Sequence, residues 1–184
     1  KCVAKYELSS DIVSELKSKV DENNYDVSSK LVGKINKQTN YYLGDLEDYF
    51  KSVFKIYVNT MYKNKSLMNN FPNFEIELMG SWLNSQIESE YNPFHAHSNC
   101  TMSSVLYLDV PETINRDNFP DGWLHFSDGE FPIDRLKLEV GDYFALPKTG
   151  DFYIFPSTLR HFVYPFKGKD TRKSIAMNAK HKII

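Results

Sequence analysis

The sequence predicts an α+β protein in which two helices cover one face of an antiparallel β-sandwich or barrel. Apolar residues recur at helical spacing in two segments before residue 63, and short alternating segments follow residue 74. Aromatic residues make up 15% of the chain, and their rings favour pleated, half-buried strands. The 184 residues suit one domain, 1–184, which we divide into helical support (1–70) and a β core (71–180).

The first helix is expected over residues 10–23, where apolar residues recur at helical spacing. Asp11 lies in its first turn, where a negative charge interacts favourably with the helix dipole. The second helix is expected over residues 44–62, with three acidic residues in its first turn and a wide apolar stripe. This stripe should pack on a sheet, and it consists of Leu46, Tyr49, Phe50, Val53, Phe54, Tyr57 and Met61.

From residue 74 onward, apolar and polar residues alternate in short segments, as in strands that bury one face. Clusters of Gly, Pro, Asn and Asp separate the segments and predict turns, one of them at residues 140–142. The expected strands lie within residues 75–78, 82–87, 101–110, 122–126, 136–140, 152–155, 161–164 and 172–177.

The charge and the cysteine content disfavour several classes of protein. A formal net charge of −2 argues against a nonspecific nucleic-acid binder, which needs a basic surface to neutralise phosphates. No apolar run approaches the roughly 18–20 residues that cross a bilayer, and no signal peptide is visible. Two cysteines do not suggest a disulfide framework. We therefore expect a cytoplasmic protein without a nucleic-acid or membrane partner.

Three histidines are candidates for a metal site. His95 and His97 are two residues apart, so on an extended strand both rings would point to one face and reach one ion. A His-x-His pair alone is also typical of a solvated or hydrogen-bonded loop end. His161 follows an apolar strand that ends at Pro156, and a strand-turn-strand would return it to the sheet. Taken alone, His161 is more typical of a structural histidine.

Arg172 and Ser174 are candidates for binding a carboxylate. They share one face of an expected strand, and an arginine that points into a barrel is costly unless it is paired. Its planar fork of donors matches a carboxylate, and the serine hydroxyl adds another donor. The alternative is an exposed arginine on an edge strand among lysines.

Four segments together resemble the iron(II)/2-oxoglutarate-dependent dioxygenase superfamily, in particular a small group of oxygenases from bacteria and their phages. They are residues 92–97, 103–108, 150–157 running to His161, and Arg172-x-Ser174, and the resemblance covers about residues 75–178. It implies a double-stranded β-helix, a jelly-roll or cupin-like barrel, with N-terminal supporting helices. It also implies that the protein is located in the cytoplasm of a bacterium or of a phage-infected host.

The same resemblance implies a ligand set for iron. His95 matches the first ligand of the superfamily and His161 the distal one, while His97 stands where the superfamily usually has a carboxylate. His97 completes a three-histidine site in the interpretation that we favour. Two others stay open: only one of His95 and His97 binds the metal, or an Asp or Glu from another strand does.

The resemblance also assigns the cosubstrate site. Arg172 and Ser174 match the positions that hold the remote carboxylate of 2-oxoglutarate, and Tyr107 matches a hydroxyl position that reaches the same group. Trp82, Asn84 and Trp123 are expected at the mouth of the pocket. Segments 85–91 and 111–122 are candidate substrate loops, although neither has a readable signature.

The implied activity is that of a 2-oxoglutarate-dependent dioxygenase acting as a hydroxylase. It would use Fe(II) and O₂ to couple the oxidative decarboxylation of 2-oxoglutarate to hydroxylation of an unknown substrate, a small molecule or a protein side chain. The alternative is a non-catalytic or 2-oxoglutarate-independent cupin-like protein with a three-histidine metal site. Arg172-x-Ser174 discriminates between them, because a 2-oxoglutarate-independent protein has no need of it.

Overall fold

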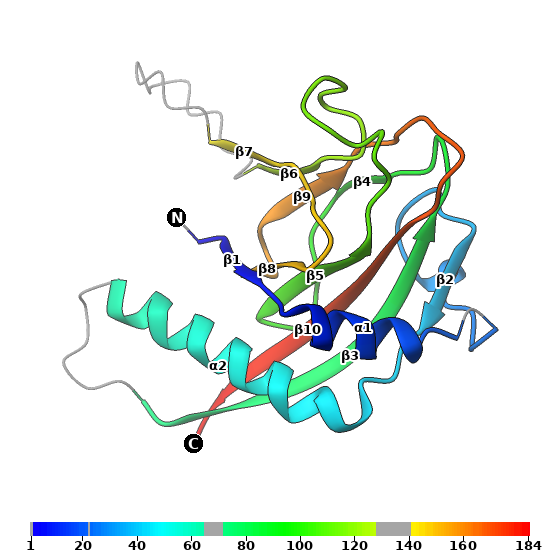
Figure 1. The fold of residues 1–184 in the computed structure, drawn as a ribbon. Helices are drawn as coiled ribbons and strands as arrows, with labels where there is room; N and C mark the ends of the chain where they lie inside the picture. Colours follow the sequence, from blue (N-terminus) through cyan, green and yellow to red (C-terminus); the bar gives the residue numbers. More distant parts are fainter. Residues whose placement is uncertain (1, 22, 65–71, 128–140) are drawn as a thin grey trace, which may run out of the picture.

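The computed structural model describes residues 2–21, 23–64, 72–127 and 141–184, and it contains two antiparallel sheets and two α-helices (Figure 1). The larger sheet has six strands in the order β1-β8-β5-β10-β3-β2. In that order the strands are Ala4–Glu7, Asp151–Pro156, Met102–Asp109, Arg172–Ile183, Phe74–Gln86 and Lys37–Asn40.

The smaller sheet has four strands in the order β4-β9-β6-β7 and lies against the large sheet at its upper end in Figure 1. In that order the strands are Asn92–His95, Arg160–Val163, Leu124–Ser127 and Asp142–Ala145. This arrangement of two antiparallel sheets with helices on one side confirms the expected double-stranded β-helix.

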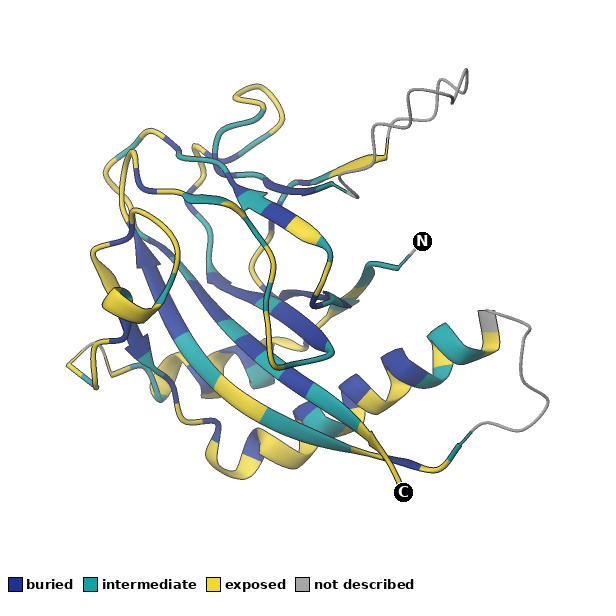
Figure 2. Cartoon of the chain, turned by 180° about the vertical axis from the view of Figure 1, so that it is seen from behind, coloured by how far each residue is buried: buried dark blue, intermediate teal, exposed yellow. Residues whose placement is uncertain are grey.

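Helices α1 (Ser10–Ser18) and α2 (Glu47–Asn64) cover the outer face of the large sheet. Ser9 caps α1 by accepting a hydrogen bond from the Ile12 amide, and the helix ends five residues earlier than expected. A short 3₁₀ turn, Gly44–Leu46, leads into α2. The stripe expected on α2 is largely confirmed, since its apolar residues meet the sheet while the outer face is exposed (Figure 2).

The large sheet buries side chains on both of its faces, and alternation along a strand assigns each side chain to one face. Phe152 and Ile154 of β8 pack against the helices, whereas Tyr153 and Phe155 face the small sheet. Full burial of one such side chain contributes roughly 1.5–3 kcal/mol. The inner face therefore carries the residues that can reach a space between the sheets.

Several elements differ from the sequence expectation. Segments 75–78 and 82–87 belong to one strand, β3, which passes through Gly80 next to a register shift in its pairing with β10. β1 and β2 were not expected, because each has only four residues. The turn expected at 140–142 is wrong at Asp142, which begins β7, and the strand expected at 136–140 lies outside the described residues. None of the described helices is long and apolar enough to cross a bilayer.

Candidate functional site

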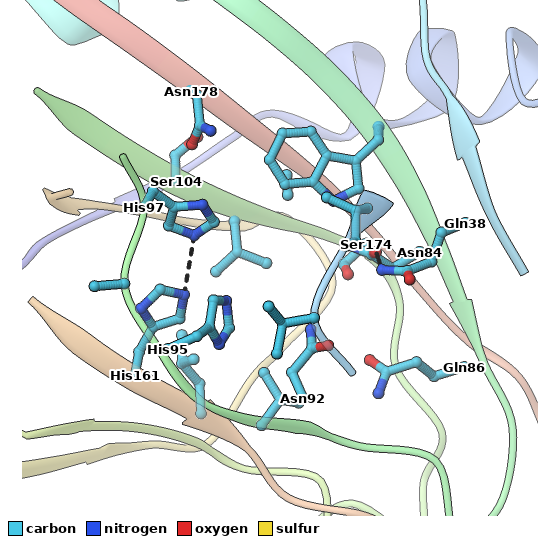
Figure 3. A pocket seen from close by; sticks show the side chains of 18 of the residues that line it. Gln38, Asn84, Gln86, Asn92, His95, His97, Ser104, His161, Ser174 and Asn178 are labelled. Carbon is cyan, nitrogen blue, oxygen red and sulfur yellow. Dashed lines mark hydrogen bonds between the residues drawn. The ribbon is translucent and has the colours of Figure 1, made fainter. Parts of the chain in front are cut away.

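Three histidines converge at one end of the space between the sheets (Figure 3). The antiparallel pairing of β4 with β9 places His95 opposite His161. One ligand nitrogen from each of His95, His97 and His161 lies within 4.8 Å of the other two, and the Nε2 atoms of His97 and His161 are 3.4 Å apart. Three nitrogens at this spacing can bind one metal ion.

His97 reaches the cluster by a route that the sequence did not predict. β4 ends at His95, so His97 lies just beyond the strand and does not continue its face. Its backbone N–H donates instead to the Ser157 carbonyl at 2.9 Å, which holds this segment against the end of β8. The expectation that His95 and His97 share a strand is therefore wrong, although the two rings do meet.

Backbone carbonyls orient two of the rings. Nδ1 of His95 donates to the Pro93 carbonyl at 2.7 Å, and Nδ1 of His161 donates to the Leu159 carbonyl at 3.1 Å. Because a carbonyl can only accept, each Nδ1 carries the hydrogen and each Nε2 keeps its lone pair. These contacts leave the Nε2 atoms available for a metal.

The cluster is neutral. Burial, together with the smaller effect of the neighbouring His95, lowers the pKa of His161 to about 3 and that of His97 to about 4. Burial also lowers the pKa of His95. Neutral imidazoles are the form that binds metals, and iron is among the metals that suit imidazole ligands.

No Asp or Glu joins these histidines within the part of the chain that the structure describes. The interpretation in which a carboxylate arrives from another strand thus finds no candidate among the described residues. The geometry matches the three-histidine interpretation, because all three rings lie within reach of one position.

A cavity of about 300 Å³ runs from the histidines along the inner face of the large sheet. Polar residues from four adjacent strands form one row across its floor, since the strand register aligns Gln38, Asn84, Ser174 and Tyr107. Arg172 also lines this cavity. The cavity thus joins the histidines to the residues expected to bind 2-oxoglutarate.

Arg172 is fully buried, with 1% of its surface exposed, and β10 is a central strand. The alternative of an exposed arginine on an edge strand is therefore wrong. One guanidinium nitrogen donates to the Gly122 carbonyl at 2.5 Å, a second donates to Oε1 of Gln86, and the Phe166 ring lies 5.6 Å away. Both hydrogen-bond acceptors are neutral, and no described carboxylate forms an ion pair with Arg172. Burial lowers its pKa, as expected for a cation without a counter-charge.

One nitrogen of this guanidinium and one neighbouring hydroxyl have no hydrogen-bond partner among the described residues. They are Nε of Arg172 and the hydroxyl of Tyr107, and both are buried. Burial raises the pKa of Tyr107 to about 12 against the opposing effect of Arg172, so the hydroxyl stays a donor. A buried cation and unpaired donors fit a carboxylate, because it would satisfy all of them.

The pocket residues expected from the sequence are partly confirmed. Trp82 and Asn84 line the cavity, but Trp123 is not among its described lining residues and donates its Nε1 to the Asn115 carbonyl. Of segment 111–122, only Gly122 contributes to the site, through the carbonyl that holds Arg172.

The sequence interpretation missed two groups of cavity residues. Gln86 follows Asn84 by two residues on β3, so strand alternation was a signal that could have identified it. Gln38 and residues 30–32 also line the cavity. The sequence of the segment that contains them shows no helix or strand periodicity, so nothing in the pattern pointed to these residues or to the short strand β2 that carries Gln38.

A protein-family model described as "Putative 2OG-Fe(II) oxygenase" matches residues 80–178, just over half of the chain and all of the site residues predicted from the sequence. A search of curated proteins finds no match.

Similar solved structures share the fold at low sequence identity. A prolyl-4-hydroxylase from Pseudomonas putida is 15% identical with a TM-score of 0.59, over 98% of this chain and 93% of that one. A viral collagen prolyl hydroxylase from Paramecium bursaria Chlorella virus-1, solved with 2-oxoglutarate, is 14% identical with a TM-score of 0.56, over 100% and 97%. HygX from Streptomyces hygroscopicus, solved with nickel and 2-oxoglutarate, is 12% identical with a TM-score of 0.59, over 97% and 82%.

Proposed function

The chain belongs to the 2OG-Fe(II) oxygenase family, and from this premise we propose that it is a 2-oxoglutarate-dependent hydroxylase. Its cofactors are Fe(II) and 2-oxoglutarate. We assign His95, His97 and His161 as the iron ligands. We assign Arg172, Ser174 and Tyr107 as the residues that bind the remote carboxylate of 2-oxoglutarate.

One observation carries this proposal: a single cavity connects three converging, neutral imidazoles to a buried arginine that has no carboxylate partner among the described residues. A buried cation without a counter-ion is costly, and a dicarboxylate cosubstrate supplies the missing charge. The unpaired Tyr107 hydroxyl supports the same assignment, because it would donate to that carboxylate.

When bound, iron and 2-oxoglutarate supply the oxidative decarboxylation that yields succinate and CO₂ and is coupled to hydroxylation by O₂. The three histidines contribute ring nitrogen lone pairs, and the Pro93 and Leu159 carbonyls orient the rings of His95 and His161 so that their Nε2 atoms face the metal position. Arg172 fixes the far end of the cosubstrate, and its own direction is fixed by Gln86 and Gly122. The substrate is a small molecule or a protein side chain.

A 2-oxoglutarate-independent protein with a three-histidine site is the competing function. Arg172 disfavours this function. A buried guanidinium without a counter-charge is costly, and a protein that does not bind 2-oxoglutarate would gain nothing from placing one in the same cavity.

The test is an anaerobic titration of the protein, first with Fe(II) and then with 2-oxoglutarate. A weak visible charge-transfer band should appear only after the second addition, because the 2-oxo acid must chelate the iron. Succinate, which lacks the 2-oxo group, is the matched control and should give no band. Iron binding without a band at saturating 2-oxoglutarate would contradict the proposal.

His97 is tested separately. His97→Ala should weaken Fe(II) binding at least tenfold, and His97→Asp should restore much of it, because a carboxylate is also an iron ligand. Unchanged affinity in His97→Ala would remove this residue from the ligand set.

A further inference from the structure

A pair of buried amide side chains, Gln38 and Asn84, lies on the floor of the cavity that holds the histidines (Figure 3). Gln38 comes from β2 and Asn84 from β3, and the register places them directly opposite each other. Only 2% of Gln38 and 5% of Asn84 is exposed. Nε2 of Gln38 donates to Oδ1 of Asn84 at 2.7 Å.

That hydrogen bond engages the amino group of Gln38 and the carbonyl oxygen of Asn84, and it leaves the other polar group of each amide open to the cavity. The carbonyl oxygen of Gln38 and the amino group of Asn84 have no hydrogen-bond partner among the described residues, and neither is fully enclosed by protein. If both amides were turned over, one carbonyl and one amino group would still remain. The pair therefore offers the cavity one acceptor and one donor.

The charged residues that line the cavity restrict the kind of chemical group that this pair can bind. No Asp or Glu is among the described residues that line it, so a cationic group would find no counter-charge. A carboxylate would satisfy the Asn84 amino group but oppose the Gln38 carbonyl with its own lone pairs. A neutral amide supplies both a carbonyl and an N–H, so it satisfies both open positions.

We propose that Gln38 and Asn84 form a substrate subsite that binds a neutral amide, either a primary carboxamide or a peptide group. This inference rests on the proposed function, and it identifies the chemical class of the substrate at that site. Ser174 follows Asn84 in the same row across the sheet, which places the subsite beside the cosubstrate residues. A substrate held there lies in the same cavity as the metal ligands.

The experiment uses the full protein labelled with ¹⁵N, loaded with Zn(II) as a diamagnetic substitute for iron and saturated with 2-oxoglutarate. Acetamide, N-methylacetamide, acetate and methylammonium are titrated separately, and the side-chain amide signals of Gln38 and Asn84 are followed. Acetamide should shift these signals saturably, whereas acetate and methylammonium should not. An equal response to N-methylacetamide identifies a peptide-like substrate group, and a response to acetamide alone identifies a primary carboxamide.

Variants test whether the amide pair is responsible. Asn84→Leu should weaken acetamide binding at least about fivefold, the effect of one lost hydrogen bond. Asn178→Leu, the same change elsewhere on the cavity wall, should leave it unchanged. Gln38→Glu keeps an acceptor and adds a negative charge, so methylammonium should now bind; this gain does not depend on the stability of the Leu variant.

Three results would overturn the inference: no shift with either amide, equal shifts with all four probes, or a shift of the Asn84 signal on adding 2-oxoglutarate that blocks acetamide. The last result would assign the pair to the cosubstrate. Failure of Zn(II) and 2-oxoglutarate to bind at all is a different outcome, which contradicts the proposed function itself.

Discussion

The two ends of the cavity are built for binding by opposite means. The histidine end offers three neutral bases, kept neutral by burial, whose ligand atoms lie within 4.8 Å of one another. The arginine end offers a permanent cation that is held by two neutral carbonyl oxygens. One end thus provides lone pairs for a cation, and the other provides a charge for an anion.

The supporting structure differs as well. His95 lies on β4, an edge strand of the small sheet, and His97 lies beyond the end of that strand. Arg172 begins β10, which lies between β3 and β5 in the large sheet. Edge strands and loop ends tolerate substitution better than central strands, since fewer packed neighbours depend on them. The comparison teaches that ligand identity can vary at His95 and His97, whereas His161, which is buried on the inner strand β9, and Arg172 are tied to packed strands.

The largest expected effect is at the histidine end. His161→Ala should reduce Fe(II) affinity by more than about 100-fold, because loss of a ligand should exceed the 10–100-fold typical of losing a ligand's supporting partner. Isothermal titration calorimetry under anaerobic conditions measures this affinity. His125→Ala is the matched control, a buried histidine on the neighbouring strand β6 that lies outside the cluster. Equal losses in both variants would indicate a general structural effect.

Removing the charge at the arginine end should affect only the cosubstrate. Arg172→Gln keeps amide donors for the neighbouring carbonyls but removes the cation, so 2-oxoglutarate affinity should fall by roughly 100-fold, about 3 kcal/mol. Fe(II) affinity should stay within about twofold. If 2-oxoglutarate binds Arg172→Gln as it binds the unchanged protein, the assignment of Arg172 is wrong.

A smaller loss of 2-oxoglutarate affinity is expected when Arg172 is kept and a negative charge is placed beside it. Gln86→Glu places a carboxylate where Oε1 now accepts from Arg172, and an ion pair there would compete with the cosubstrate. We expect about tenfold weaker 2-oxoglutarate binding, with the charge-transfer titration as the measurement. Gln86→Leu removes the contact without adding charge, so it should weaken binding less. A larger loss in Gln86→Leu would mean that Gln86 acts by positioning rather than by neutrality.

The smallest effect is expected at Tyr107, where one substitution should raise the stability of the cosubstrate-free protein and weaken 2-oxoglutarate binding. The Tyr107 hydroxyl is buried without a partner among the described residues, so Tyr107→Phe should stabilise the cosubstrate-free protein by about 1 kcal/mol. The same change should weaken 2-oxoglutarate binding about three- to tenfold, because a donor to its carboxylate is lost. Denaturant unfolding and calorimetry measure the two quantities.

Tyr153→Phe is the control for that prediction. The Tyr153 hydroxyl donates to Asp151 at 3.3 Å, so its loss should lower stability and leave 2-oxoglutarate affinity unchanged. Lower stability in Tyr107→Phe as well would contradict the claim that its hydroxyl is unsatisfied.

The sequence by itself determined the helices, the inward and outward faces of most strands, and the residue types of the site. These features are local, because a period of 3.6 or 2 residues is visible within one segment. Two examples are the apolar stripe of α2 and the position of Arg172 and Ser174 on the same face of one strand. The order of motifs from His95 to Arg172 also carried the family resemblance, which the family match confirms.

Only the tertiary structure decided which side chains meet. Gln86 contacts Arg172 across 86 residues of sequence, and Gln38 contacts Asn84 across 46. Such partners depend on strand order and register, which the alternation within a single strand does not specify. His97 shows the same limit, because its position follows from a backbone hydrogen bond to Ser157 rather than from the strand pattern. The sequence supplied the chemistry of the site, and the pairing of distant strands assembled it.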